Sequence, residues 1–298
     1  MRRKTNLLIT LILASCLLGC VNESKKKEDS LLAQQKDSIY RERIEYLLPS
    51  PQELMSFAKD QGYTYKEFLV NPLENIEEIN LFRNQALYFG MYFCDFYYLS
   101  VFDKNTQSLK YLTTLRQLSL KLSIEHFFKE SFFKRMEDNY SNLDSLKEIS
   151  IELSSDVFNS LDQTDNNMLF SIIGIGSIVE ALYLTANSIT DAQKQPRLVS
   201  SVYDIGEFYE NFFSSFLVFC NDEKSLKPLL MDLTEVRDIL HKGKVERNNT
   251  SSATKKMTSS GMKIKISDDS KKSSSDENFS LLKAKVINIR TKIVNQQY

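Results

Sequence analysis

Glycine and proline are scarce in this chain, with 8 glycines and 5 prolines among 298 residues. Ordinary usage of the two together is about 12%. Sandwiches and barrels with many strands need turn residues at short intervals, so a chain this poor in them is not expected to form one. The remaining alternative is a fold of long helices joined by few loops, and we therefore predict an all-α fold.

Apolar residues recur at steps of three or four through the body of the chain, residues 42–242. This spacing is the period of a helix with one buried face, and no stretch of useful length alternates with period two. We therefore predict a multi-helix bundle of about eight helices. The expected helices cover residues 51–61, 71 to about 99, 109–122, 124–137, 143–161, 168–186, 196–220 and 225–242.

The composition changes after residue 242. Residues 243–278 are rich in Ser, Thr, Lys and Asp, which predicts a disordered linker. Residues 279–298 return to a helical pattern and predict a terminal amphipathic helix, whose docking on the body is favoured over pairing with another copy or lying on an anionic surface. Its apolar positions are Phe279, Leu282, Val286, Ile289 and Ile293.

The N-terminus has the form of a secretory signal. Arg2, Arg3 and Lys4 precede an apolar core at 7–18, which is too short to span a membrane as a helix. We predict that residues 1–19 are a signal peptide. Leu17-Leu18-Gly19-Cys20 resembles the lipobox of bacterial lipoproteins, in which the cysteine is acylated and becomes the first residue of the mature chain.

A second lipobox-like stretch, 13–16, ends in Cys16. We prefer Cys20 because cleavage at Cys16 leaves Leu17 and Leu18 exposed, whereas Cys20 is followed by Val21 and then by a polar run that begins at Asn22. Residues 20–41 then form a tether, and acyl chains such as palmitate on Cys20 hold the protein to the bilayer. We expect a bacterial envelope protein on the outer membrane, at its periplasmic or its surface face.

Composition argues against several functional classes. The 38 basic and 39 acidic residues are balanced and interleaved, so nucleic acid is not an expected partner. The two histidines, His126 and His241, lie near neither a cysteine nor each other, so we expect no metal site, and no motif indicates a cofactor. Cys94 and Cys220 fit buried small apolar residues, although an oxidising envelope also permits a bridge between them.

Two segments are more apolar than the rest. Residues 87–102 carry aromatic side chains on all sides, which favours a central buried helix over a ligand platform, and Gly90 within it predicts close approach of a neighbouring helix. Gly174-Ile175-Gly176 lacks the surroundings of a dinucleotide fingerprint and predicts tight helix packing.

Asp95 and Glu180 lie inside these two apolar segments, so both carboxylates should be buried. A buried carboxylate needs a partner, and we expect Arg116, His126, a tyrosine hydroxyl or a helix N-terminus to supply it. A satisfied structural role is favoured over acid/base chemistry.

Residues 90–98, with Gln107, Tyr111 and 172–183, resemble a group of uncharacterised helical lipoproteins of Bacteroidota over roughly residues 50–240. The resemblance implies an α-helical envelope protein and no known activity. If its polar positions form a pocket, that pocket consists of Asp95, Tyr98, Gln107, Tyr111 and Glu180.

Together these features predict a lipid-anchored helical binding or assembly module with no catalytic residues assigned. Its partner would be a protein, an envelope polymer or a small ligand. The alternative is a small hydrolase-like envelope enzyme that uses Asp95 and Glu180. That alternative requires the two carboxylates to meet at a cavity that solvent can reach.

Overall fold

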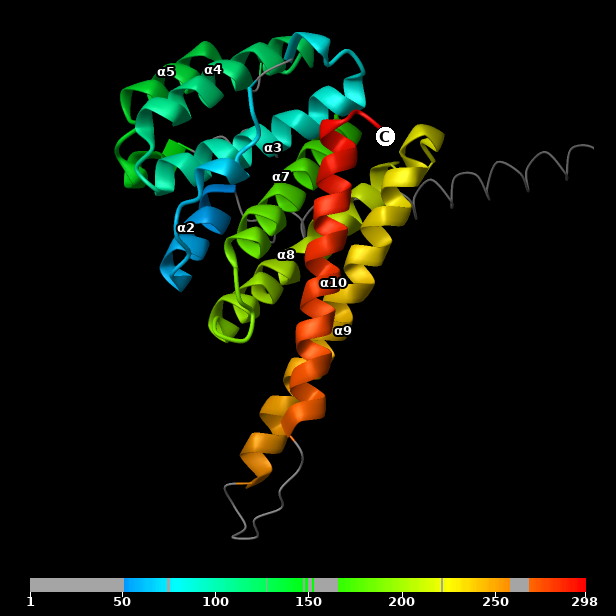
Figure 1. The fold of residues 1–298 in the computed structure, drawn as a ribbon. Helices are drawn as coiled ribbons and strands as arrows, with labels where there is room; N and C mark the ends of the chain where they lie inside the picture. Colours follow the sequence, from blue (N-terminus) through cyan, green and yellow to red (C-terminus); the bar gives the residue numbers. More distant parts are fainter. Residues whose placement is uncertain are drawn as a thin grey trace, which may run out of the picture. The chain divides into compact units, whose positions relative to one another are not determined.

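The computed structural model describes residues 51–73, 76–126, 128–146, 148–149, 152, 166–220, 222–257 and 268–298. Every regular element in these residues is helical, which confirms the all-α bundle (Figure 1). The predicted signal peptide, Cys16, Cys20 and the tether lie outside the described residues. The α-helices are α2 (Pro51–Gln61), α3 (Phe82–Val101), α4 (Asn105–Lys121), α5 (Glu130–Asp138), α7 (Asn167–Ser188), α8 (Pro196–Cys220), α9 (Lys227–Met257) and α10 (Asp268–Val294), and the 3-10 helices are η1 (Glu67–Leu69), η2 (Ile76–Glu78) and η3 (Lys224–Leu226).

Helices α3 and α7 pack directly against each other at the centre of the bundle. A Cβ atom on Gly90 would lie 2.0 Å from the carbonyl oxygen of Ile173, and one on Gly176 would lie 2.2 Å from that of Leu87. Ser177 Oγ donates a hydrogen bond to the Gly90 carbonyl at 3.0 Å. The glycines therefore bring the two backbones into contact, as the sequence predicted.

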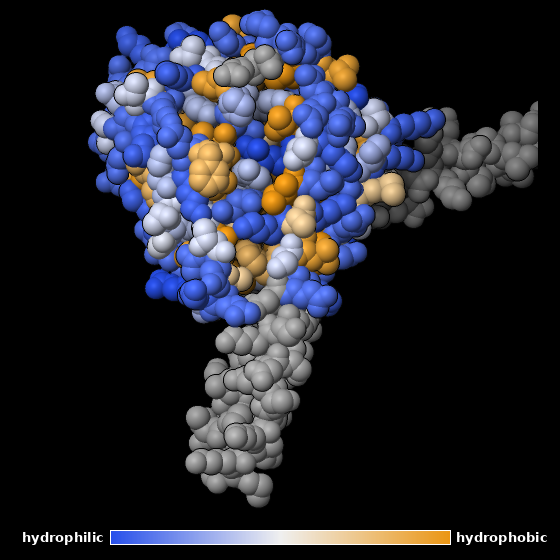
Figure 2. Space-filling view, viewed as in Figure 1, coloured by the Kyte–Doolittle hydropathy of each residue, from blue (hydrophilic) through white to orange (hydrophobic). Residues whose placement is uncertain are grey.

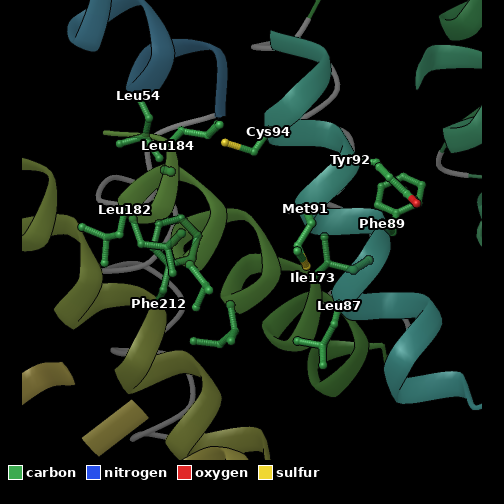
Figure 3. Close-up of a cluster of buried hydrophobic side chains, with 14 of the residues drawn as sticks. Leu54, Leu87, Phe89, Met91, Tyr92, Cys94, Ile173, Leu182, Leu184 and Phe212 are labelled. Atoms are coloured by element: carbon green, nitrogen blue, oxygen red, sulfur yellow. The ribbon is translucent and has the colours of Figure 1, made fainter. Parts of the chain in front are cut away.

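The core is built around this pair. Figure 3 shows buried side chains of α3 and α7, among them Cys94 and Leu184, together with side chains of α2 and α8. Most of the aromatic side chains of α3 are buried, which confirms that it is a core helix. Cys94 and Cys220 are both buried and unbridged.

α7 is the one helix in the described part of the chain that is long and apolar enough to cross a membrane. In the bundle, 78% of its most apolar 18-residue stretch is buried. Because α2, α3, α8 and α10 all pack against it, its apolar character is that of a core helix.

The predicted start of the second expected helix, which corresponds to α3, is wrong. Asn71-Pro72 has the form of a helix start, yet α3 begins at Phe82, eleven residues after the predicted start at 71. Side chains from other helices hold the backbone of this segment in place: Tyr92 Oη donates to the Pro72 carbonyl at 2.9 Å, and Tyr111 Oη donates to the Asn71 carbonyl. These tertiary hydrogen bonds outweigh the local preference for a helix.

Other helix boundaries agree with the prediction to different degrees. α2 and α8 have the predicted bounds, whereas α5 begins at Glu130 rather than at residue 124. α9 continues to Met257, and α10 begins at Asp268, so the structure places helix on parts of the predicted linker; residues 258–267 lie outside the described part.

The C-terminal helix docks on the body, as predicted. α10 packs along α9 and also against α7 and α3 (Figure 1). Two hydrogen bonds to one carboxylate fasten α10 to α9, because Asp232 accepts from Lys285 and from Lys292, each at 2.6 Å. All five apolar positions of the predicted stripe, Phe279, Leu282, Val286, Ile289 and Ile293, are buried.

Candidate functional site

The five polar residues predicted as a pocket are all directed to one segment of the chain. We call residues 65–72, which lie between α2 and η2 and include η1, the strap. Asp95, Tyr98, Gln107 and Tyr111 each form a hydrogen bond with an atom of the strap. Glu180 reaches it through Arg290.

The outer end of the strap is held by α3 and α4. The amide of Lys66 donates to Tyr98 Oη at 2.8 Å. Gln107 accepts a hydrogen bond from Tyr65 Oη at 2.9 Å and donates one to Glu67 at 3.1 Å. Burial raises the pKa of Tyr98 to about 12, so its hydroxyl stays protonated at neutral pH.

The inner end of the strap is held by Asp95. Its Oδ2 accepts hydrogen bonds from the backbone N of Asn71 at 3.1 Å and from Asn71 Nδ2 at 3.0 Å. Asp95 is fully buried, and burial, together with the nearby charge of Glu180, raises its pKa well above the usual range.

Glu180 is paired with an arginine from the other end of the chain. Arg290 Nε lies 3.1 Å and 2.9 Å from the two carboxylate oxygens of Glu180, and Arg290 Nη2 donates to the Leu69 carbonyl at 3.0 Å. The guanidinium also lies 3.9 Å from the centre of the Tyr183 ring. One side chain of α10 thus ties α7 to the strap.

Sequence reasoning found the two buried carboxylates but not their partners. Arg116, which we expected to pair with one of them, instead pairs with Glu130 and Glu137 at 3.3 Å and 3.0 Å. The true partner of Glu180 was detectable as an arginine within the apolar stripe of α10. A buried arginine requires a buried acid, and Glu180 was a candidate.

Two lysine contacts with the C-terminal end of α7 were also not predicted from the sequence, one from the strap and one from α10. Lys66 Nζ donates to the carbonyl of Ser188 at 2.7 Å, and Lys283 Nζ donates to that of Ile189 at 2.9 Å. Both carbonyls belong to the C-terminal end of α7, where the helix dipole favours positive charge. No spacing in the sequence pointed to either contact, because each partner lies about 100 residues away or further.

The arrangement performs a structural task. Asp95 and Glu180 are both fully buried, so neither carboxylate meets the solvent-reachable cavity that acid/base chemistry requires. Among the described residues no group of three or more His, Cys, Asp and Glu side chains is placed to hold a metal ion. Four of the five residues predicted as a pocket bond to the strap directly, and Glu180 reaches it through Arg290.

Comparisons with protein families, with curated proteins and with solved structures find no match to this chain.

The face shown in Figure 2 is largely hydrophilic, with apolar side chains scattered between the polar ones. The most exposed large apolar side chain among the described residues is Phe68, in the strap, at 77%. Met231 and Leu120 follow at 69% and 60%.

Proposed function

We propose that this protein is a lipid-anchored binding or assembly module of a bacterial envelope, held to the outer membrane through acylated Cys20. The observation that carries the proposal is the stretch Leu17-Leu18-Gly19-Cys20, which ends an apolar core of signal-peptide length and precedes a polar run. Two or more acyl chains on one cysteine are enough for stable anchoring without a spanning helix.

The internal use of the polar core favours a binding module over an enzyme. The five polar residues predicted as a pocket all contribute to holding the strap, Glu180 through Arg290. A domain of this kind can act through its surface, by contact with a protein or an envelope polymer.

Phe68 is the contact that we propose for such a partner. Burying a phenylalanine that is 77% exposed removes apolar surface from water, and aromatic residues are frequent among the side chains that dominate interfaces. The neighbouring backbone is fixed by hydrogen bonds at Lys66 and Leu69, so little conformational entropy is lost on binding.

The anchor is tested by metabolic labelling with an alkyne-bearing fatty acid. We expect the wild-type protein and Cys16→Ser to incorporate the label and to fractionate with membranes. Cys20→Ser should do neither. Equal labelling of Cys20→Ser would contradict the assignment of Cys20, and an unlabelled wild-type protein would contradict the anchor itself.

The partner is tested by site-specific photo-crosslinking in intact cells of the source bacterium. A photoreactive residue in place of Phe68 should give a discrete adduct that depends on Cys20. The control position is Leu120, which is similarly exposed but lies 13 residues beyond Gln107 along α4, or about 20 Å at helical rise. Identical adduct patterns from both positions would show that Phe68 is not a specific contact.

A further inference from the structure

Asp95 has one carboxyl oxygen with two hydrogen-bond donors and one with none. Oδ2 accepts from the backbone N and the Nδ2 of Asn71, whereas Oδ1 is buried without a hydrogen-bond partner. Asn71 Oδ1 is also buried without a partner. Asp95 Oδ1 and Asn71 Oδ1 are therefore two buried acceptors without a donor, and a buried polar atom that lacks its hydrogen bond destabilises the folded state.

The nearby positive charge is already committed. Arg290 Nε contacts both carboxylate oxygens of Glu180 on α7, and its Nη2 donates to the Leu69 carbonyl of the strap. If both carboxylates were ionised, the buried cluster would carry two negative charges against one positive charge. An ionised carboxylate with no cation of its own is strongly unfavourable inside a protein.

The other groups around Asp95 do not supply a cation. Glu180 and Arg290 belong to the pair already described, and the rest are hydroxyls and a thiol whose pKa values are raised by burial. All of them are neutral at neutral pH. They are Tyr92, Cys94 and Tyr98 on α3, Tyr111 on α4 and Tyr183 on α7.

We propose that Asp95 is a neutral carboxylic acid in the folded protein, and that its proton acts as a latch which keeps the strap closed on the bundle. The proton on Oδ1 provides the donor that Asp95 Oδ1 and Asn71 Oδ1 both lack. An acid and a carboxamide can then pair through two hydrogen bonds, one in each direction. Removing the proton leaves an unpaired buried charge next to Glu180, and opening the strap relieves it.

The proposal fixes the sign of a pH effect. The unfolded chain ionises Asp95 above its usual pKa of about 3.9, whereas the folded protein keeps the proton to a higher pH. Between these two pKa values the folded state binds one proton more than the unfolded state. The contribution of Asp95 to stability is therefore fully present below about pH 3.9, and the folding equilibrium constant falls about tenfold per pH unit until the folded pKa is reached.

Asp95→Asn isolates this effect, because asparagine resembles the neutral acid and does not titrate. We expect the ratio of folding constants, variant over wild type, to rise about tenfold per pH unit from about pH 5 upward, measured by denaturant unfolding. The control is Asp232→Asn. Burial opposes ionisation of Asp232, but hydrogen bonds from Lys285, Lys292 and Tyr298 outweigh it and lower its pKa. Its ratio should lie below one and stay flat over the same range.

Two further measurements do not depend on how well the variant folds. Carbon NMR of the wild-type protein labelled at its aspartate carboxyl carbons should show one signal in the neutral-acid position at pH 7. Hydrogen exchange, corrected for its intrinsic pH dependence, should show the amide of Asn71 losing protection as the pH rises. At each pH its protection should lie below that of Leu233 in α9, as expected if the strap opens before the helices unfold. A set of aspartate carboxyls that are all ionised at pH 7, or a pH-independent ratio for Asp95→Asn, would overturn the neutral acid. A neutral Asp95 with pH-independent protection of Asn71 would overturn the latch.

Discussion

Arg290 is the residue on which the polar core most depends. It pairs with Glu180, a carboxylate 110 positions away in the sequence, and it holds a carbonyl of the strap 221 positions away. A buried pair of this kind adds little net stability compared with apolar residues of the same shape, but loss of one partner leaves an uncompensated charge. The arginine is therefore indispensable as long as the glutamate is present.

Arg290→Met should destabilise the protein by about 3–5 kcal/mol in denaturant unfolding, because Glu180 is fully buried. Arg135→Met is the matched control. It breaks the exposed contact of Arg135 with Glu152, so it should change stability little. Combining Glu180→Leu with Arg290→Met should restore much of the loss. Equal effects of the two arginine substitutions would contradict the role given to Arg290.

Gly90 is a second residue on which the fold depends, because a Cβ atom at this position would collide with the backbone of α7. Alanine would normally improve a helix by about 0.5–1 kcal/mol relative to glycine. Here its Cβ would lie 2.0 Å from the Ile173 carbonyl, so we expect Gly90→Ala to cost about 1–3 kcal/mol or more, because the two backbones must separate.

Gly174→Ala is the control for Gly90→Ala. Its Cβ would meet a side-chain atom of Phe212 at 2.8 Å, and a ring can move where a backbone cannot. Thermal or chemical unfolding of both variants tests the difference. If Gly174→Ala proved the more damaging of the two, backbone contact between α3 and α7 would not be what the glycine provides.

At the scale of elements, periodicity predicted helices well and their ends less well. α2 and α8 begin at prolines that directly follow a polar residue, Ser50 and Gln195, and both were predicted at the observed bounds. The region before α3 has the same proline signal, but its backbone is bonded by Tyr92, Tyr111 and Asp95, which lie 20 to 40 residues further along the chain. Such long-range contacts cannot be predicted from the local sequence, and the predicted helix therefore began too early.

The docking of α10 gives a prediction for this helix as an element. Ile289 is fully buried against the bundle, whereas Ile287, two residues earlier, is 38% exposed. Ile289→Ala should cost about 2–5 kcal/mol and Ile287→Ala clearly less, with the same change of helix propensity in both. Melting temperatures of the two variants provide the comparison. Equal losses would mean that α10 does not dock through the face that the structure gives it.

At the scale of the whole molecule, the fold class and the buried carboxylates followed from the residues, but the way the carboxylates are used did not. Asp95 and Glu180 stood out because a charge within an apolar helix needs a reason. Their partners, Asn71 and Arg290, come from a loop and from the last helix. Only the folded structure brings these segments together. In it, Asp95 and Glu180, which were predicted to line a pocket, hold the strap in place.

The mature N-terminal residue, and the mass attached to it, test the proposed function most directly. Mass spectrometry of the N-terminal peptide from the native membrane should find Cys20 as the first residue, carrying acyl chains. A mature chain that begins elsewhere, or a Cys20 without lipid, would contradict the proposal that this helical module works from a membrane anchor.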